Sequence, residues 1–147
     1  MSLLEKKQIA WQFMDEVFNK GNIQEAGKFV ASDVIYHGRG EDIDGLDKFK
    51  EWINSDSDIF PDIHYTLIDE IAEGIPEFSK VVLVWIVEAT HAKEFRGIPA
   101  TNRKFETVGV SIFHFKDTKI NEVWAVADGL TPALELGVVK VVSSESK

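Results

Sequence analysis

Asp128 and the four histidines are the side chains of this sequence best suited to moving a proton to or from a small molecule. Strand alternation from Lys119 to Asp128 predicts one mostly apolar face, made of Ile120, Trp124, Val126 and Asp128. Such surroundings disfavour a charged carboxyl group and raise its pKa, which suits a general acid or base. Alternatively, Asp128 binds backbone at a turn with Gly129, since Asp before Gly is common turn chemistry. The residues alone leave both interpretations open.

The histidines are His37, His64, His91 and His114. None stands in an H-x-H or H-E-x-x-H arrangement, so we predict no metal site. His91 ends a long strand and shares a face with Trp85, so it faces either a pocket or, as a loop-end imidazole, the solvent. If the last turn has three residues, His114 shares a face with Asp128 but lies more than about 20 Å away. A two-residue turn puts it on the opposite face.

The remaining candidates are aromatic rings and His37, which ends a short strand and can bind either substrate or local backbone. Trp85 and Trp124 are candidates for the walls of a pocket for a flat ligand, although core packing is the commoner fate of such rings. Trp52, on a predicted helix, most simply packs in the core and is kept as a possible substrate contact. These residues are the candidates for a functional site: Asp128 and His91 for catalysis, and His37, Trp85, Trp124, His114 and Trp52 for substrate binding.

Size and charge restrict the class of protein. The chain has 147 residues, which is enough for one domain, and we expect that domain over 1–137 with a partly disordered tail over 138–147. The net charge is −9, which disfavours nucleic acid and anionic membranes as partners. No signal peptide is recognised, and the longest apolar run, 81–87, is far shorter than the roughly 20 residues of a membrane helix. Cysteine is absent, which fits a cytoplasmic protein.

The hydrophobic pattern predicts an α+β fold. Helices are expected over 4–20, 23–30 and 46–54, and strands over 34–37, 63–72, 80–91, 104–115 and 119–128. Helices on one face of a strongly curved antiparallel sheet make a cone with an open mouth, where an internal pocket forms readily. The run 81–87 is apolar on both faces of its strand, so we expect helices to cover one face. A partner subunit is expected on the other face, which makes a homodimer through the sheet.

Five pieces of the sequence, in order, resemble the SnoaL-like polyketide and ester cyclases. They are Phe60-Pro61-Asp62-Ile63-His64, Trp85, Thr90-His91-x-x-x-Phe95-x-Gly97-x-Pro99-x-Thr101, Phe113-x-Phe115-x-Asp117-x-Lys119-Ile120-x-Glu122-x-Trp124-x-x-x-Asp128, and Leu134-x-Leu136-Gly137. The resemblance covers roughly the whole chain and implies the cone-shaped fold of nuclear transport factor 2, with three N-terminal helices inside the curved sheet. Lys93 and Asn102 stand where the family usually has glycine.

The resemblance also implies a function. In this family a carboxylate late in the last strand, here Asp128, is the general acid/base of an intramolecular ring closure that uses no metal and no organic cofactor. The expected ligand is then a small, apolar, carbonyl-containing molecule, with His91 and His37 orienting or polarising its carbonyl. Two alternatives remain open: a non-catalytic binding module of the same fold, and a related isomerase, dehydratase or hydrolase.

Overall fold

The fold is known from a computed structural model that describes residues 1–38 and 40–142. The predicted tail over 138–147 therefore lies partly outside the described residues. In chain order the elements are α1 (Leu3–Phe13), the π-helix η1 (Met14–Asn19), the 3-10 helix η2 (Ile23–Lys28), β1 (Val30–His37), β2 (Ile43–Asp44), α2 (Leu46–Ile59), β3 (His64–Gly74), β4 (Phe78–Thr90), β5 (Lys104–Lys116), β6 (Lys119–Ala127) and α3 (Leu130–Glu135).

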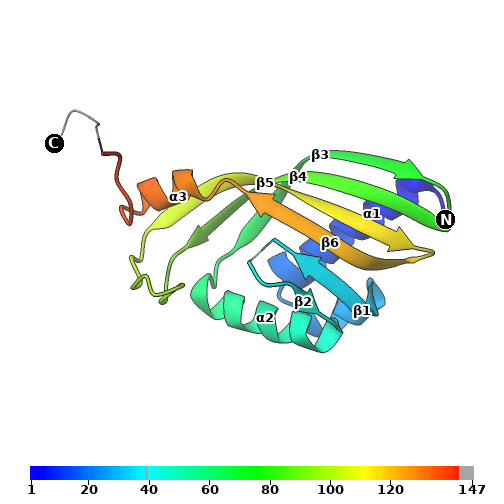
Figure 1. Ribbon diagram of the computed structural model, residues 1–147, viewed down its shortest axis with the longest axis horizontal. Coiled ribbons are helices and arrows are strands. Elements are labelled where there is room, and N and C mark those ends of the chain that lie inside the picture. Colours follow the sequence, from blue (N-terminus) through cyan, green and yellow to red (C-terminus); the bar gives the residue numbers. More distant parts are fainter. Residues whose placement is uncertain (39, 143–147) are drawn as a thin grey trace.

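The strands form one curled sheet in the order β2-β1-β6-β5-β4-β3. The helices α1 and α2 lie against one side of this sheet, and α3 lies beyond the end of β6 (Figure 1). The predicted α+β fold, with a curved sheet around N-terminal helices, is therefore confirmed. One pairing differs from the expected antiparallel sheet, because β1 runs parallel to β6. A parallel pair needs a long crossover, and the whole of α2 to β5 separates these two strands in the chain.

The two faces of the sheet have different environments, which β4 shows most clearly. Val81, Leu83 and Trp85 are buried under the helices on what we call the inner face. Val82 and Val84 point to the opposite side, the outer face, and are only half-buried. The helices α1, η1 and α2 cover the inner face, and within residues 1–38 and 40–142 no helix covers the apolar outer side of β4 in the same way.

The hairpin between β5 and β6 corrects the predicted faces of the last strand. Lys116 pairs with Lys119, so the turn has two residues, and Phe115 pairs with Ile120 whereas His114 pairs with Glu122. One extra residue in β6 is a β-bulge, which reverses the alternation on its two sides. Ile120 is fully buried on the inner face, while Trp124 and Val126 are exposed on the outer face. The prediction that Ile120 shares a face with Trp124 and Asp128 is therefore wrong.

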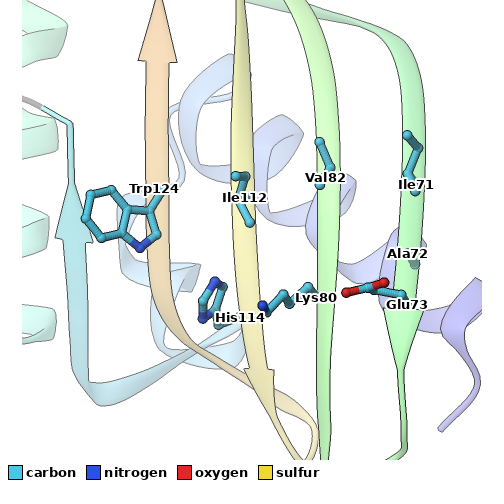
Figure 2. Close-up of a pocket in the computed structure, with 8 residues that line it drawn as sticks. All are labelled: Ile71, Ala72, Glu73, Lys80, Val82, Ile112, His114 and Trp124. Atoms are coloured by element: carbon cyan, nitrogen blue, oxygen red, sulfur yellow. The ribbon is translucent and has the colours of Figure 1, made fainter.

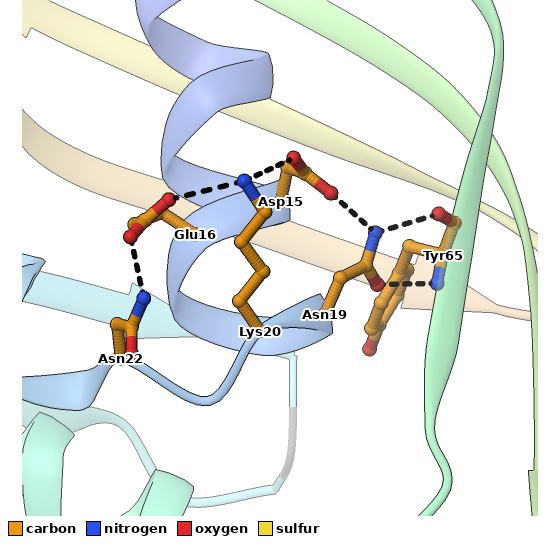
Figure 3. A network of polar contacts seen from close by, with 6 residues as sticks. All are labelled: Asp15, Glu16, Asn19, Lys20, Asn22 and Tyr65. Carbon is orange, nitrogen blue, oxygen red and sulfur yellow. Dashed lines mark hydrogen bonds and ion pairs between the residues drawn. The ribbon is translucent and has the colours of Figure 1, made fainter.

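The π-helix η1 is joined to the start of β3 by the side-chain amide of Asn19, which pairs with the backbone of Tyr65 as a neighbouring strand would (Figure 3). Asn19 donates from Nδ2 to the carbonyl oxygen of Tyr65 over 2.9 Å and accepts from its N–H over 2.7 Å. Asp15 accepts a second bond from Asn19 and pairs with Lys20 at 3.6 Å. The wider turn of a π-helix carries the Asn19 side chain toward β3, which forms one edge of the sheet.

At the opposite end of β3, a buried lysine ties α1 to the turn that leads into β4. Lys6 is fully buried. Its Nζ donates to the carbonyl oxygen of Pro76 over 2.7 Å and to Oγ of Ser79 over 2.6 Å. The ammonium group also lies 5.7 Å from the centre of the Phe115 ring. Helix α1 is thus held to the sheet by polar as well as apolar contacts.

Candidate functional site

The fold divides the seven candidate residues among three places. Trp52, Trp85 and His91 lie on the helix side of the sheet, His37, His114 and Trp124 lie on the outer face, and Asp128 stands where β6 leads into α3. Trp85 and Trp124 are therefore on opposite faces, and one cavity cannot include both rings.

On the inner face, Trp85 is held by contacts on several sides. Its Nε1 donates to Oγ of Ser111 over 3.0 Å, and its ring meets that of Tyr65 edge-on at 4.8 Å. Opposite the ring stands Gly109, where an added Cβ would lie only 2.3 Å from the indole. Trp52 packs against Tyr36 with ring centres 4.8 Å apart. Trp85, Tyr65 and Tyr36 belong to the buried core, and Trp52 packs against it.

His91 lies beyond the end of β4 and is only 3% exposed. Its Nδ1 lies 3.2 Å from Oγ1 of Thr101, and its ring centre is 6.3 Å from that of Phe60. Its Nε2 is buried and has no hydrogen-bond partner among the residues that the structure describes. A buried polar atom without a partner costs about 1–3 kcal/mol, so this nitrogen is available to an incoming donor or acceptor.

Three residues that sequence reasoning left without a role hold this histidine in place. Asp62 accepts bonds from the N–H of Thr90 over 2.7 Å and from its hydroxyl over 2.6 Å. The hydrogen bond from the Thr90 hydroxyl is the main cause that lowers the pKa of Asp62, and the bond from the Thr90 N–H acts in the same direction. Thr101 contacts the imidazole itself. All three residues belong to the motif pieces quoted above, and this membership was the sequence signal that could have pointed to them. In the structure their contacts position His91.

The helix side of the sheet contains a cavity of about 70 Å³. Ile53, Asp56 and Ser57 of α2 line it together with Val17 and Phe18 of η1 and with Gly21, Ile23 and Ile63. Ligand pockets commonly measure about 300–1,000 Å³, so this cavity takes a molecule of substrate size only if the surrounding rings move. It lies near the end of α2, whose residue Ile59 accepts a hydrogen bond from the N–H of Ala92.

Asp128 binds backbone and hydroxyl groups at the start of α3. Its Oδ1 accepts from the N–H of Leu130 over 3.0 Å and from that of Thr131 over 3.1 Å, and its Oδ2 accepts from the Thr131 hydroxyl. The Thr131 hydroxyl is the main cause that lowers the pKa of Asp128, and the two backbone N–H groups act in the same direction. The carboxylate therefore binds the backbone at the start of α3 from the position before its N-cap, Gly129.

On the outer face, a chain of ionisable groups joins His37 to His114. Nδ1 of His37 lies 2.8 Å from Oδ1 of Asp42, and its Nε2 lies 2.7 Å from Oε2 of Glu122. The other oxygen of Glu122 lies 3.1 Å from Nδ1 of His114. The His37 ring stacks on Trp124, with centres 3.8 Å apart. Both nitrogens of His37 thus face carboxylates, an arrangement that suits the doubly protonated ring.

Burial alone would lower the pKa of His37, but the carboxylates of Glu122 and Asp42 outweigh burial and raise it. Because the pKa of His37 is raised on folding, the ring stabilises the fold fully at pH values below its pKa in the unfolded chain, about 6.5. This stabilisation is lost as the pH rises through the pKa of His37 in the folded protein. We expect the Glu122→Gln variant to show a lower His37 pKa in an NMR titration of the ring. Equal pKa values in the two proteins would contradict the assigned ion pair.

Beside this chain of ionisable groups, the outer face carries a cavity of about 600 Å³ (Figure 2). Ile71, Val82, Ile112 and Trp124 form its apolar part, and Ala72, Glu73, Lys80 and His114 complete it. Three of these residues form a row across neighbouring strands, because Glu73 pairs with Lys80 and Lys80 with His114.

Two further kinds of site were sought. Over residues 1–38 and 40–142, no group of three or more His, Asp or Glu side chains is arranged to hold a metal ion. Within the same ranges, no helix has both the length and the apolar character needed to cross a membrane.

A cone-shaped α+β domain with an aromatic interior and a buried histidine at its mouth is the class that this fold and site define. The family of SnoaL-like polyketide cyclases matches residues 8–136. The chain belongs to this family, as the resemblance read from the sequence implied. Among curated proteins, no sequence matches the chain.

Solved structures show the same fold. A putative polyketide cyclase from Acidithiobacillus ferrooxidans is 26% identical, with a TM-score of 0.76 over 95% of this chain and 100% of that one. AclR, a putative hydroxylase from Streptomyces galilaeus, is 22% identical, with a TM-score of 0.78 over 95% of this chain and 100% of its own. A putative SnoaL-like polyketide cyclase from Jannaschia is 14% identical, with a TM-score of 0.82 over 93% of this chain and 94% of its own.

Proposed function

We propose that the chain is a cofactor-independent enzyme of the cyclase type that acts on a small, carbonyl-containing molecule on the inner face of the sheet. The observation that carries the proposal is the buried, unpartnered Nε2 of His91. A substrate oxygen bonded to this nitrogen would satisfy a polar atom that the protein leaves unpaired. Family membership and the similar putative polyketide cyclase support the same class of reaction.

In this proposal His91 carries the proton chemistry. A neutral imidazole can take a proton from the carbon next to a carbonyl and return it in a later step. Thr101 binds Nδ1, so the ring orientation is fixed and Nε2 is the atom that faces the substrate. The rings of Trp85 and Trp52 would then contact the apolar body of the ligand.

Asp128 has a positioning role in the proposal. Its N–H donates to the carbonyl oxygen of Val108, whereas the N–H of His91 donates to that of Arg103. Arg103 and Val108 are five residues apart, which separates the two positions by about 16.5 Å at roughly 3.3 Å per residue. The carboxylate also holds α3, and its lowered pKa makes it a weak proton acceptor. The rival assignment, with Asp128 as the acid/base, is tested by the same experiment.

The experiment measures exchange of the α-protons of ethyl acetoacetate with D2O by proton NMR. We expect the protein to accelerate exchange and His91→Phe to reduce the catalysed rate by about 100-fold or more, since a positioned general base contributes roughly 10²–10⁴-fold. Asp128→Asn should keep the rate within about tenfold of the parent. Circular dichroism of both variants checks that each is folded.

The control separates the two assignments. Thr131→Val removes the hydroxyl that binds Asp128 and leaves the carboxylate in place. If Asp128 were the base, Asp128→Asn would abolish exchange and Thr131→Val would shift the pH profile. A full rate in His91→Phe would overturn the proposal.

A non-catalytic binding module is the second candidate. The observation in its favour is the engagement of the Asp128 carboxylate with Leu130 and Thr131. A module of this kind would bind the ester, seen as a shift of the His91 ring nitrogen signals, without accelerating exchange.

We also propose that the chain forms a homodimer through the outer face of the sheet. Val126, Ile71 and Trp124 are 62%, 58% and 47% exposed on this face, and exposed apolar patches of this kind mark interaction sites. Sedimentation equilibrium should give twice the chain mass of 16.6 kDa. The chain mass alone at high protein concentration would contradict it.

A further inference from the structure

The chain bulges opposite His91, just before β5 begins. The N–H of His91 donates to the carbonyl oxygen of Arg103 over 3.0 Å, and the His91 carbonyl oxygen accepts from the N–H of Asn102 over 2.8 Å. Two residues thus face one, and Asn102 has the left-handed φ of 56° that is typical of the first residue of such a β-bulge. The next inward pair along the strands is Ala89 with Phe105, so alternation puts Arg103 on the same side of the sheet as His91.

The guanidinium group of Arg103 has more donors than partners, because an arginine carries five N–H donors. One of them, on Nη1, reaches the carbonyl oxygen of Leu136 at 3.5 Å, which is long for a hydrogen bond. Within residues 1–38 and 40–142 no carboxylate forms an ion pair with Arg103, and the residue is exposed. An arginine in this state is suited to bind a carboxylate through two parallel hydrogen bonds.

The segment 92–104, which carries Arg103, is basic although the chain as a whole is acidic. It contains one acidic residue and four basic residues, Lys93, Arg96, Arg103 and Lys104. The formal charge of the segment is therefore +3, against −9 for the whole chain. All four basic residues are exposed. A surface patch of one sign raises the local concentration of molecules of the opposite charge, so this segment favours the approach of an anion.

Carboxylates near this segment are bonded or face the other side of the sheet. Asp62 accepts hydrogen bonds from the N–H and the hydroxyl of the last residue of β4. Glu88 and Glu106 pair across β4 and β5, where alternation turns both to the outer face. Among the residues that the structure describes, Arg103 thus keeps its charge without an acidic partner beside His91.

We propose that Arg103 binds a carboxylate of the substrate while His91 acts at its carbonyl group, so the substrate is an anionic carbonyl compound. The inference rests on the proposed function and adds the charge of the substrate. Residues opposite each other on paired strands have Cβ atoms about 4.5–5.5 Å apart, so one small molecule can contact both side chains. His91 is buried and Arg103 is exposed, so the carbonyl end lies inside and the carboxylate stays at the mouth. There it keeps part of its hydration, which limits the cost of taking a charge out of water.

The test compares two esters that differ by one charge, through exchange of their α-protons with D2O followed by proton NMR. The monoethyl ester of β-ketoadipic acid, with its ester on the carboxyl group next to the exchanging protons, keeps a carboxylate at its far end. The diethyl ester is neutral. We expect Arg103→Gln to raise the KM of the monoester by about tenfold or more, because a charge-assisted contact is lost. The KM of the diethyl ester should rise by less than about threefold, since it has no carboxylate for Arg103 to bind.

Two further variants serve as controls. Lys48→Gln removes a positive charge from the exposed side of α2, away from the segment 92–104, and should leave both esters unaffected. Arg103→Lys keeps the charge but loses the paired donors, so its KM for the monoester should lie between those of the parent and Arg103→Gln. An Arg103 that only held α3 through Leu136 would affect both esters alike.

The outcomes separate this inference from the proposed function. A parent protein that exchanges neither ester faster than buffer overturns the proposed function. An NMR titration of the Arg103 Nε signal with the monoester then decides the inference alone, and an unchanged signal overturns it. If the parent accelerates exchange but Arg103→Gln changes both esters equally or neither, the function stands and Arg103 does not bind a carboxylate. A loss confined to the monoester supports the inference.

Discussion

Gly109→Ala should lower the free energy of unfolding by about 3 kcal/mol or more, which is the upper end of the usual cost of overpacking a core. The new Cβ would lie 2.3 Å from the indole of Trp85 and 2.6 Å from the carbonyl oxygen of Val126. Trp85 has little room to move, because Ser111 and Tyr65 hold it from other sides. Urea denaturation followed by circular dichroism measures the change.

Gly129→Ala is the matched control for this substitution. An added Cβ at Gly129 meets no atom within 4 Å. Its effect on the free energy of unfolding should stay within about 0.5 kcal/mol, as for most exposed positions. Equal effects of the two substitutions would show that Trp85 does not lie against β5 as described.

Lys6→Met should lower the free energy of unfolding by about 2–4 kcal/mol. Methionine keeps most of the side-chain volume, so the main loss is the donor to Pro76 and Ser79. A buried acceptor left without its partner costs about 1–3 kcal/mol. The attraction between the ammonium group and the Phe115 ring is lost as well.

The neighbouring residue supplies the control. Lys7→Met changes the same side-chain type one position further along α1, where the partner is Glu70 at 3.9 Å and both side chains reach solvent. Such surface pairs contribute about 0–1 kcal/mol. If Lys6→Met were no more destabilising than Lys7→Met, the buried contacts of Lys6 would contribute nothing measurable.

The helical and strand elements were largely predictable because their hydrophobic periods are regular. The predicted helix over 4–20 is present as α1 followed by η1, and the predicted strand over 104–115 is β5 almost residue for residue. The change from the α-helix α1 to the π-helix η1 was not predictable, because the spacing of the apolar residues is compatible with either kind of helix. The parallel partner of β1 was also missed, since it pairs with a strand about 90 residues later.

The site was predictable in its residue types but not in its grouping. Trp85 and His91 share the inner side, as alternation along β4 predicted. A single bulged residue in β6 moves Trp124 to the other face, and nothing in the alternation of apolar and polar residues signals it. The contact of His37 with Glu122 joins residues 85 positions apart, which only the assembled sheet brings together. Asn102 adopts a φ of 56°, in the left-handed region that favours glycine and that asparagine enters more readily than most residues, and the hydrophobic pattern does not signal it.

The attachment of Asn19 to Tyr65 has a consequence for how the protein behaves at high concentration. An exposed edge strand offers unpaired N–H and C=O groups to the strands of other molecules and so promotes aggregation. On β3 the amide of Asn19 already occupies both backbone groups of Tyr65. The pairing of β3 with β4 is also irregular between Leu67 and Asp69, and a kinked edge is a poor template for a foreign strand. The Asn19 side chain and the bulge in β3 thus protect the edge of the sheet from pairing with strands of other molecules, which disfavours aggregation at high protein concentration.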